Sequence, residues 1–119
     1  MARVDDLALP KPTGIPRAEL SVRRDRLLDY LRAEQLSGYV LFDDKYIQYF
    51  TSFGFLATER PVAFIQSASG DMAVFVPEFE VERVLAETEF ERVESYPEYP
   101  GVEHPMHILA RVLADMGIR

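Results

Sequence analysis

Residues 62–76 read VAFIQSASGDMAVFV, and this stretch determines the topology of the predicted sheet. Two apolar runs, Val62–Gln66 and Met72–Val76, flank a polar link, Ser67–Asp71, that contains a glycine. Such runs are typical of β-strands. Five linking residues suffice for a hairpin but are too few for the crossover that parallel pairing needs. We therefore predict that these two strands pair antiparallel.

A helix and a further strand precede the hairpin. From about Pro16 to Leu36 apolar residues follow a helical period, and Gly38 suits the C′ position that ends a helix. The apolar stripe consists of Leu20, Leu27, Leu28 and Leu31. The next run, Tyr39–Phe42, is apolar on both faces, which indicates a strand in the centre of a sheet. Residues 1–16 have no steady period, so we interpret them as an N-terminal arm.

A short helix and a loop connect that strand to the hairpin. Asp43 or Asp44 can cap a helix that runs through Phe50. We expect three aromatic side chains of this helix to point inward, namely Tyr46, Tyr49 and Phe50. The segment Thr51–Glu59 contains Gly54 and is predicted to be a loop.

Two helices and an edge strand follow the hairpin. Pro77 opens a helix to about Thr88, Phe90–Tyr96 has the character of an edge strand, and Pro105–Met116 is an amphipathic helix that Gly117 ends. The inner side of the first of these helices is assigned to Phe79, Val81, Val84 and Leu85. A Pro/Gly loop, residues 97–104, joins the strand to the last helix. This order predicts an α/β fold: a mixed β-sheet with one antiparallel hairpin, flanked by helices, with a further strand expected after Arg119.

Composition and charge limit the possible partners. The chain has 119 residues, the size of one domain, and a net charge of −7. Residues 39–119 hold six Lys/Arg against fourteen Asp/Glu, a balance that repels phosphate backbones, so we expect no nucleic-acid partner. In the first helix, acidic residues alternate with Arg23, Arg24, Arg26 and Arg32, a pattern typical of a solvated face. No long apolar run is present, so we expect a cytoplasmic protein without membrane contact.

Few side chains in the sequence are candidates for catalysis or metal binding, and none of them predicts an active site or a metal site. His104 and His107, with Glu103 beside them, could hold a metal ion, but the start of a helix explains them more simply. The pair Asp43-Asp44 resembles the magnesium-binding pair of response-regulator receiver domains. The predicted hairpin argues against that fold and favours helix capping. No base accompanies Ser52, Ser67 or Ser69, and the chain has no cysteine. We predict no catalytic residue, metal site or cofactor in this chain.

Several segments, in order, resemble the N-terminal domain of the creatinase, prolidase and Xaa-Pro aminopeptidase family. The matching segments are RRDRLL (23–28), YVLF (39–42), YIQYFTSFGF (46–55), RPV (60–62), VPEFEVER (76–83) and SYP (95–97). The family's N-I-x-Y-L-T-G-F consensus is recognisable in the third. Two departures are that Lys45-Tyr46 stands where Asn is frequent, and that an extra residue precedes Gly54. The resemblance covers about residues 17–119, and we assign that range to the domain.

The resemblance implies a two-domain hydrolase whose catalytic C-terminal domain is absent from this chain. That domain would bind two divalent metal ions (Mn, Co or Zn). The present chain would then be the non-catalytic N-terminal domain of a proline-specific peptidase and inactive by itself. Its partners would be its own catalytic domain, a second subunit in a homodimer, and the peptide substrate. Two alternatives stay open: a creatinase-like amidinohydrolase and a stand-alone interaction module.

The family resemblance also implies two substrate-binding residues in the loop before the hairpin, Phe55 and Arg60. An arginine offers a planar, permanently charged donor to a substrate carboxylate. The same loop carries an apolar group formed by Phe53, Phe55 and Leu56. These side chains either fold back onto the domain's own core or reach a partner subunit, and the sequence leaves both possibilities open.

Overall fold

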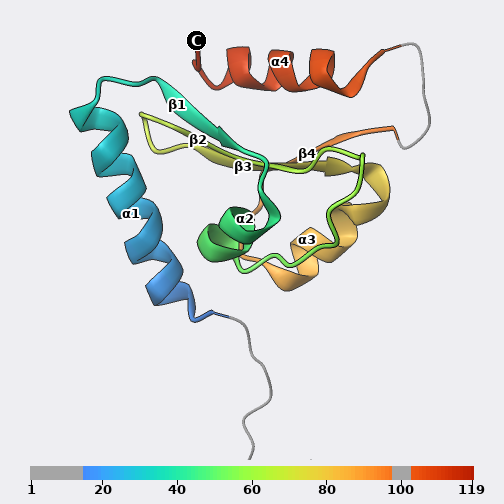
Figure 1. Ribbon diagram of the computed structural model, residues 1–119, viewed down its shortest axis with the longest axis horizontal. Helices are drawn as coiled ribbons and strands as arrows, with labels where there is room; N and C mark the ends of the chain where they lie inside the picture. Colours follow the sequence, from blue (N-terminus) through green and yellow to red (C-terminus); the bar gives the residue numbers. More distant parts are fainter. Residues whose placement is uncertain (1–14, 98–102) are drawn as a thin grey trace, which may run out of the picture.

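The computed structural model describes residues 15–97 and 103–119. The predicted arm therefore lies outside the described residues except for Ile15 and Pro16, and most of the predicted loop 97–104 does too. The elements are α1 (Arg17–Ala33), β1 (Gly38–Leu41), α2 (Asp44–Thr51), β2 (Ala63–Ser67), β3 (Met72–Pro77), the 3₁₀ helix η2 (Glu78–Glu80), α3 (Val81–Glu87), β4 (Val93–Tyr96) and α4 (Pro105–Asp115) (Figure 1).

The described strands form one mixed sheet in the order β1-β2-β3-β4. β1 pairs antiparallel with β2, β2 antiparallel with β3, and β3 parallel with β4. The predicted hairpin is confirmed, with Gly70 in its turn at a φ of 101° that favours glycine. Since this hairpin replaces a helical crossover, the topology differs from that of a receiver domain.

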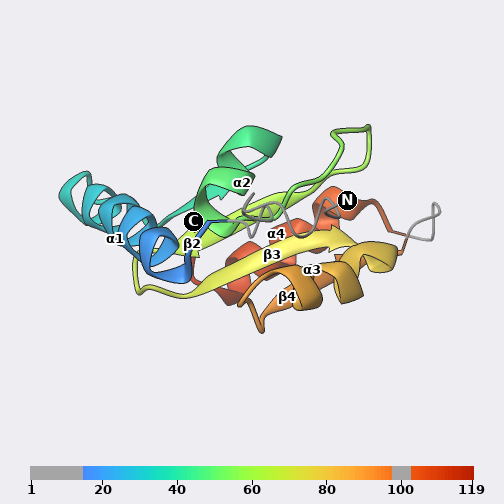
Figure 2. The same cartoon turned by 90° about the horizontal axis from the view of Figure 1, so that it is seen from below.

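Helices cover both faces of the sheet. α1, α2 and α3 lie on one face and α4 on the other, and Figure 2 shows the sheet between α3 in front and α4 behind. On the first face Phe64 of β2 packs in a cluster with Ile47 of α2 and Val84 of α3. On the second face the strands meet a row of apolar residues from α4 and its C-cap: Leu109, Val112 and Met116. The predicted α/β fold, a mixed sheet flanked by helices, is confirmed.

The prediction that the first strand lies in the centre of the sheet is wrong. Among the described residues β1 pairs with β2 only, so it lies at an edge. The strand is nevertheless apolar on both faces because both are covered. Leu41 packs against the cluster beneath α2, and Val40 packs against the cluster beneath α4. Coverage by helices, rather than a central position, explains its composition.

The first helix ends earlier than predicted, and Gly38 is not its C′ residue. α1 stops at Ala33, and Gln35 takes the left-handed conformation with a φ of 56°. Gly38 instead begins β1, where a Cβ atom would stand 2.5 Å from Cγ1 of Ile118 and 2.8 Å from the carbonyl oxygen of Gln66. Glycine is needed here because two chain segments approach closely, not because a helix ends.

Not all of the aromatic side chains of α2 point inward. Asp43 caps this helix as predicted, because its carboxylate accepts bonds from the backbone N–H groups of Lys45 and Tyr46. Ile47 provides the buried contact, and Phe50 is half-buried. Tyr46 and Tyr49 were predicted to point inward but are 60% and 45% exposed.

The helix predicted from Pro77 is divided into η2 and α3, and its inner side differs in part. Pro77 ends β3, and the chain makes one 3₁₀ turn before the α-helix starts at Val81. Val84 is buried and Val81 packs partly against the core, as predicted. Phe79 and Leu85 were placed on the same side but are half exposed.

Arg24 was predicted to lie on a solvated face, but it is 6% exposed. Its guanidinium group donates to the backbone oxygen of Phe50 at 3.0 Å and to the carboxylate of Glu89, and it lies 5.2 Å from the ring centre of Phe90. Arg23 also departs from the prediction, since its side chain is 19% exposed and donates to the backbone oxygen of Tyr49 at 2.8 Å, whereas Arg26 and Arg32 are exposed as predicted.

Candidate functional site

The segment between α2 and β2 is a loop, as predicted, and both of its ends are anchored. We call residues 52–61 the aromatic loop. At its start Thr51 donates its hydroxyl to the backbone oxygen of Ile47 at 2.6 Å and accepts from the N–H of Phe53 at 3.0 Å. At its end the backbone oxygen of Pro61 accepts a 2.8 Å bond from the hydroxyl of Tyr96. These bonds fix the points at which the loop leaves and rejoins the core.

Arg83 of α3 joins the aromatic loop to the neighbouring helix. Its guanidinium carbon lies 4.8 Å from the ring centre of Phe53, and Nη2 donates to the backbone oxygen of Gly54. The same side chain pairs with Glu80 at 3.1 Å and with Glu87 at 3.3 Å. One arginine therefore holds the loop's first turn against α3.

A cleft of about 290 Å³ lies between the aromatic loop and the start of α3. We call it the loop cleft, and its lining consists of Phe55, Leu56, Thr58, Arg60, Val62, Pro77, Phe79, Glu80 and Arg83. The guanidinium carbon of Arg60 lies 5.3 Å from the ring centre of Phe79. The cleft thus combines two guanidinium groups with two aromatic rings.

Tyr96 is a buried residue of β4 that contacts the end of the aromatic loop. Its ring stacks on Phe75 with centres 5.0 Å apart. Burial raises the pKa of Tyr96 to about 12, while the positive charge of Arg60 acts in the opposite direction. The phenol is therefore neutral at ordinary pH and serves as a hydrogen-bond donor to the loop, not as a base.

The structure brings Phe55 and Arg60 to the same cleft, although their role in substrate binding remains a prediction. The loop's apolar group folds back onto the domain's own core in part, as one of the two possibilities predicted, while contact with a partner subunit stays a prediction. Phe53 is fully buried and Phe55 stacks on it at 5.7 Å, whereas Leu56 is 87% exposed. The sequence interpretation missed Phe79 and Arg83. The charge pattern of Arg83 with Glu80 and Glu87, three and four residues away, was a usable signal for a fixed arginine.

The arrangement can bind and position an anionic or apolar group, but it contains no reacting pair. Ser52 accepts a 3.2 Å bond from the N–H of Ile15, and Ser67 and Ser69 bond each other at 2.6 Å. His104 caps α4, since its Nδ1 accepts from the N–H of Met106 at 3.1 Å. None of these groups shows the nucleophile–base geometry that covalent catalysis needs.

A metal pair of the kind that the resemblance implies does not fit this part of the molecule. Within residues 15–97 and 103–119, no group of three or more histidine or carboxylate side chains is arranged to hold a metal ion. In the same ranges no helix has the length and apolar character needed to cross a bilayer.

Comparison with known proteins agrees with the family resemblance found in the sequence. The family model of the creatinase/prolidase N-terminal domain matches residues 23–118. No curated protein matches the chain. Among solved structures, a proline dipeptidase from Streptococcus pneumoniae TIGR4 is 28% identical with a TM-score of 0.69, and the match covers 80% of this chain and 67% of that one.

Two further structures share the fold. The N-terminal domain of an Xaa-Pro dipeptidase from Lactobacillus brevis is 24% identical, with a TM-score of 0.71 and coverage of 81% of this chain and 69% of that one. Dipeptidase PepE from Mycobacterium ulcerans is 19% identical, with a TM-score of 0.72, and the match covers 85% of this chain but 27% of that one. Since the family model spans most of the sequence, the chain belongs to the creatinase/prolidase N-terminal domain family.

Proposed function

We propose that this domain is the non-catalytic N-terminal part of a proline-specific dipeptidase or aminopeptidase, where it supports dimerisation and shapes the substrate cleft. The family membership and the 28% identity to a proline dipeptidase support the type of parent enzyme. The observation that carries the role in substrate binding is that Phe55 and Arg60 line one cleft on an anchored loop.

In this role the aromatic loop reaches the substrate of a partner subunit. The nearly complete exposure of Leu56 supports this, because an apolar side chain at a loop tip gains free energy when a partner covers it. Arg60 would donate to a carboxylate of the peptide, and Phe55 would contact its apolar part. Arg83 and Tyr96 would hold the loop in place without touching the peptide.

The hydrolytic chemistry would belong to a catalytic domain elsewhere in the parent protein. That domain would hold two divalent metal ions, and the residues described here take no part in binding them. Such an enzyme would work in the cytoplasm as a homodimer. The comparison with dipeptidase PepE, of which this chain covers 27%, supports the presence of a further domain in the parent protein.

The test is the replacement of Arg60 by alanine in the full-length enzyme. Loss of a charge-assisted hydrogen bond of about 1.5–3 kcal/mol would lower kcat/KM for an X-Pro dipeptide roughly 10- to 150-fold, with an unchanged melting temperature. Arg60→Lys would recover part of the activity, because lysine keeps the charge but loses the planar donor pair.

The matched control is Arg26→Ala, which removes an exposed arginine from α1 and should change neither quantity. If kcat/KM of Arg60→Ala is unchanged, or falls only as far as the melting temperature does, Arg60 has no role in substrate binding. A full-length protein that cleaves no X-Pro peptide at all would contradict the whole proposal.

A further inference from the structure

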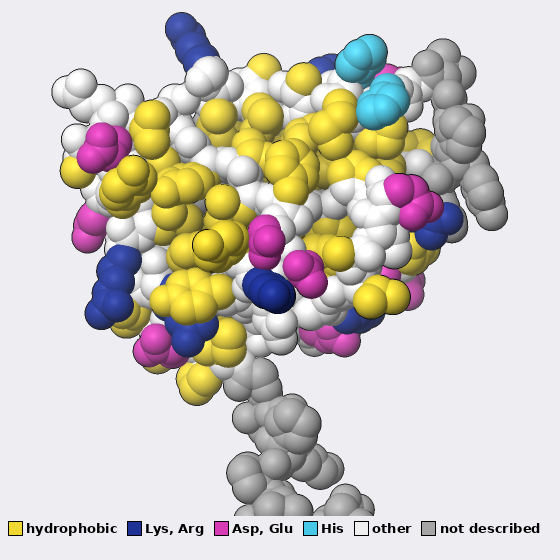
Figure 3. Space-filling view, in the orientation of Figure 1, with side chains coloured by type: hydrophobic (Ala, Val, Ile, Leu, Met, Phe, Trp, Pro, Cys, Tyr) yellow, Lys and Arg dark blue, Asp and Glu magenta, His cyan; other side chains and the backbone are white. Residues whose placement is uncertain are grey.

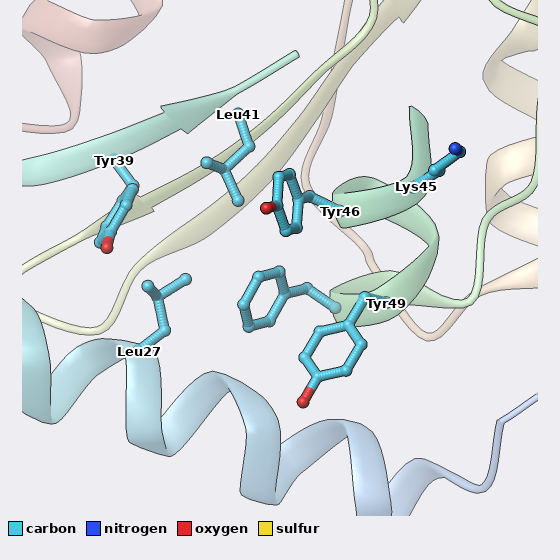
Figure 4. A pocket seen from close by; sticks show the side chains of 7 residues that line it. Leu27, Tyr39, Leu41, Lys45, Tyr46 and Tyr49 are labelled. Atoms are coloured by element: carbon cyan, nitrogen blue, oxygen red, sulfur yellow. The ribbon is translucent and has the colours of Figure 1, made fainter. Parts of the chain in front are cut away.

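An apolar hollow of about 480 Å³ lies between α1, β1 and α2, and its chemistry differs from that of the loop cleft. Hydrophobic side chains gather over these elements in Figure 3, and Figure 4 shows Leu27, Leu41 and Tyr46 pointing towards one another. The one charged residue of its lining, Lys45, points away from them in the same view. The hollow therefore offers apolar surface without a directed charge, whereas two guanidinium groups line the loop cleft.

Two cation–π contacts join the aromatic loop to η2 and α3, and they run in opposite directions. The guanidinium carbon of Arg60, in the loop, lies 5.3 Å from the ring centre of Phe79 in η2. The guanidinium carbon of Arg83, in α3, lies 4.8 Å from the ring centre of Phe53 in the loop. A guanidinium group is attracted to the face of an aromatic ring at such distances. Each side of the cleft therefore places a charge over a ring of the other side.

The contact made by Arg83 serves the fold. Phe53 beneath it is fully buried. All three nitrogen atoms of its guanidinium group donate: Nε to Glu87, Nη1 to Glu80, and Nη2 to the backbone oxygen of Gly54. A guanidinium group engaged in this way is poorly suited to bind a further anion, so Arg83 is a structural link between α3 and the loop.

Phe79 is held at a fixed position without being buried. η2 follows the buried Pro77, which pairs with Tyr96 in the β3–β4 ladder, and α3 begins directly after η2 at Val81. The ring of Phe79 is nevertheless 50% exposed, so packing in the core does not explain it. Single exposed apolar side chains are common on proteins. This one differs because its ring lies under the guanidinium group of a residue that lines the same cleft.

We propose that Phe79 is a positioning residue for Arg60, whose guanidinium group it holds in the loop cleft ready to donate to a carboxylate of the peptide substrate. The inference rests on the proposed function, which assigns Arg60 to the substrate. An arginine side chain loses rotamer freedom when it binds a ligand, and a ring that already restrains it reduces this cost. An aromatic face also attracts the cation without engaging its N–H donors in hydrogen bonds, as a carboxylate partner would.

A double-mutant cycle in the full-length enzyme tests the inference. Phe79→Leu keeps an apolar side chain but removes the ring face. It should lower kcat/KM for an X-Pro dipeptide about 2- to 5-fold, the size expected for an exposed cation–π contact. In the Arg60→Ala background the same substitution should have no effect, because Phe79 acts only through Arg60. A purely structural contribution of Phe79 would lower kcat/KM equally in both backgrounds.

Two further variants provide a rescue and a control. Phe79→Tyr keeps the ring face and should retain the kcat/KM of the unchanged enzyme. Leu85→Ala removes a side chain of α3 that is also 50% exposed but does not line the cleft, and it should leave kcat/KM unchanged. The melting temperature is measured for every variant, so that a loss of folded protein is distinguished from a loss of positioning.

NMR of residues 1–119 measures the contact apart from catalysis. The ring current of an aromatic side chain shifts the resonances of protons that lie over its face. Phe79→Leu should therefore move the side-chain resonances of Arg60 towards their ordinary positions. Those of Arg83, which lies over Phe53, should stay unchanged and are the internal control.

Equal effects of Phe79→Leu in the two backgrounds, or no effect in either, would overturn the inference, and so would Arg60 resonances that do not move. A lowered kcat/KM for Arg60→Ala together with an unaffected Phe79→Leu would contradict the role of Phe79 and leave the proposed function intact. An unchanged kcat/KM for Arg60→Ala would overturn both, because Arg60 would then have no substrate role for Phe79 to support.

Discussion

Arg24 connects three parts of the domain through one buried guanidinium group. Its side chain extends from α1, donates to the backbone oxygen of Phe50 at the end of α2, and pairs with Glu89 ahead of β4. Phe90 packs under the same group. Because arginine has five donors in a planar fork, it can satisfy several acceptors at once in a place where a lysine could satisfy fewer.

Replacing Arg24 by alanine should lower the free energy of unfolding by about 2–4 kcal/mol. The substitution leaves the oxygen of Phe50 without this donor and Glu89 with the longer 3.9 Å contact to Arg17, and it removes the packing of the arginine stem. Urea unfolding of residues 1–119 measures the loss. Arg26→Ala is the control and should change the value by less than about 0.5 kcal/mol. A loss of that small size for Arg24→Ala would show that the buried pair contributes no net stability.

At the scale of the elements, sequence patterns correctly predicted the features that depend on residues close together in the chain. The hairpin, the cap at Asp43 and the amphipathic face of α4 depend on neighbours within a few residues, and all three are confirmed. The place of β1 in the sheet depends on which segments cover it, and these come from distant parts of the sequence. A run such as Tyr39–Phe42 cannot distinguish a central strand from an edge strand covered by helices on both faces.

The contact between the end of α4 and the start of β1 gives a prediction at this scale. Gly38→Ala should destabilise residues 1–119 by about 1–3 kcal/mol, because the new methyl group meets Ile118 and the backbone oxygen of Gln66 within 2.8 Å. The side chain can move, but the backbone oxygen belongs to β2 and cannot shift without disturbing the sheet. Thermal or urea unfolding measures the effect.

Gly54→Ala is the matched control for that substitution. The atom nearest to its added methyl group would be Nε2 of Gln48 at 3.6 Å, an ordinary contact with the end of a flexible side chain. We expect a change of less than about 0.5 kcal/mol. If Gly38→Ala and Gly54→Ala have equal effects, close approach of Ile118 and β2 is not the reason for glycine at position 38.

At the scale of the whole molecule, only part of the candidate site could be predicted from the sequence. Phe55 and Arg60 were identified by the family resemblance, and the fold places both in the loop cleft. Phe79 and Arg83 share that cleft because the 3₁₀ turn and α3 fold against the loop. The charges around Arg83 indicate a fixed arginine, but they do not indicate that it contacts this loop. The exposed Tyr46 and Tyr49 have a similar origin, since an inward orientation requires a covering segment that the described residues do not supply.

The absence of a reacting pair in the described residues leads to a prediction for the purified chain. Residues 1–119 should cleave no X-Pro dipeptide and should bind no stoichiometric Mn²⁺, Co²⁺ or Zn²⁺. The physical reason is that hydrolysis of an amide needs an activated nucleophile and a group that stabilises the developing charge, such as a metal-bound water at a set of converging ligands. Here His104 caps a helix, Glu80 and Glu89 pair with arginines, and no three ligands converge within the described ranges.

The assay compares residues 1–119 with the full-length enzyme at equal concentration, with and without added divalent metal, and metal content is measured on both after dialysis. Full-length protein should lose its activity with a chelator, while the folded state of the shorter chain should be unaffected because no metal ligand set supports it. Turnover that remains with the shorter chain through several purification steps, and that disappears when one of its own residues is replaced, would show that this domain is catalytic. Stoichiometric metal in the shorter chain would contradict the assignment of the metal ions to another domain.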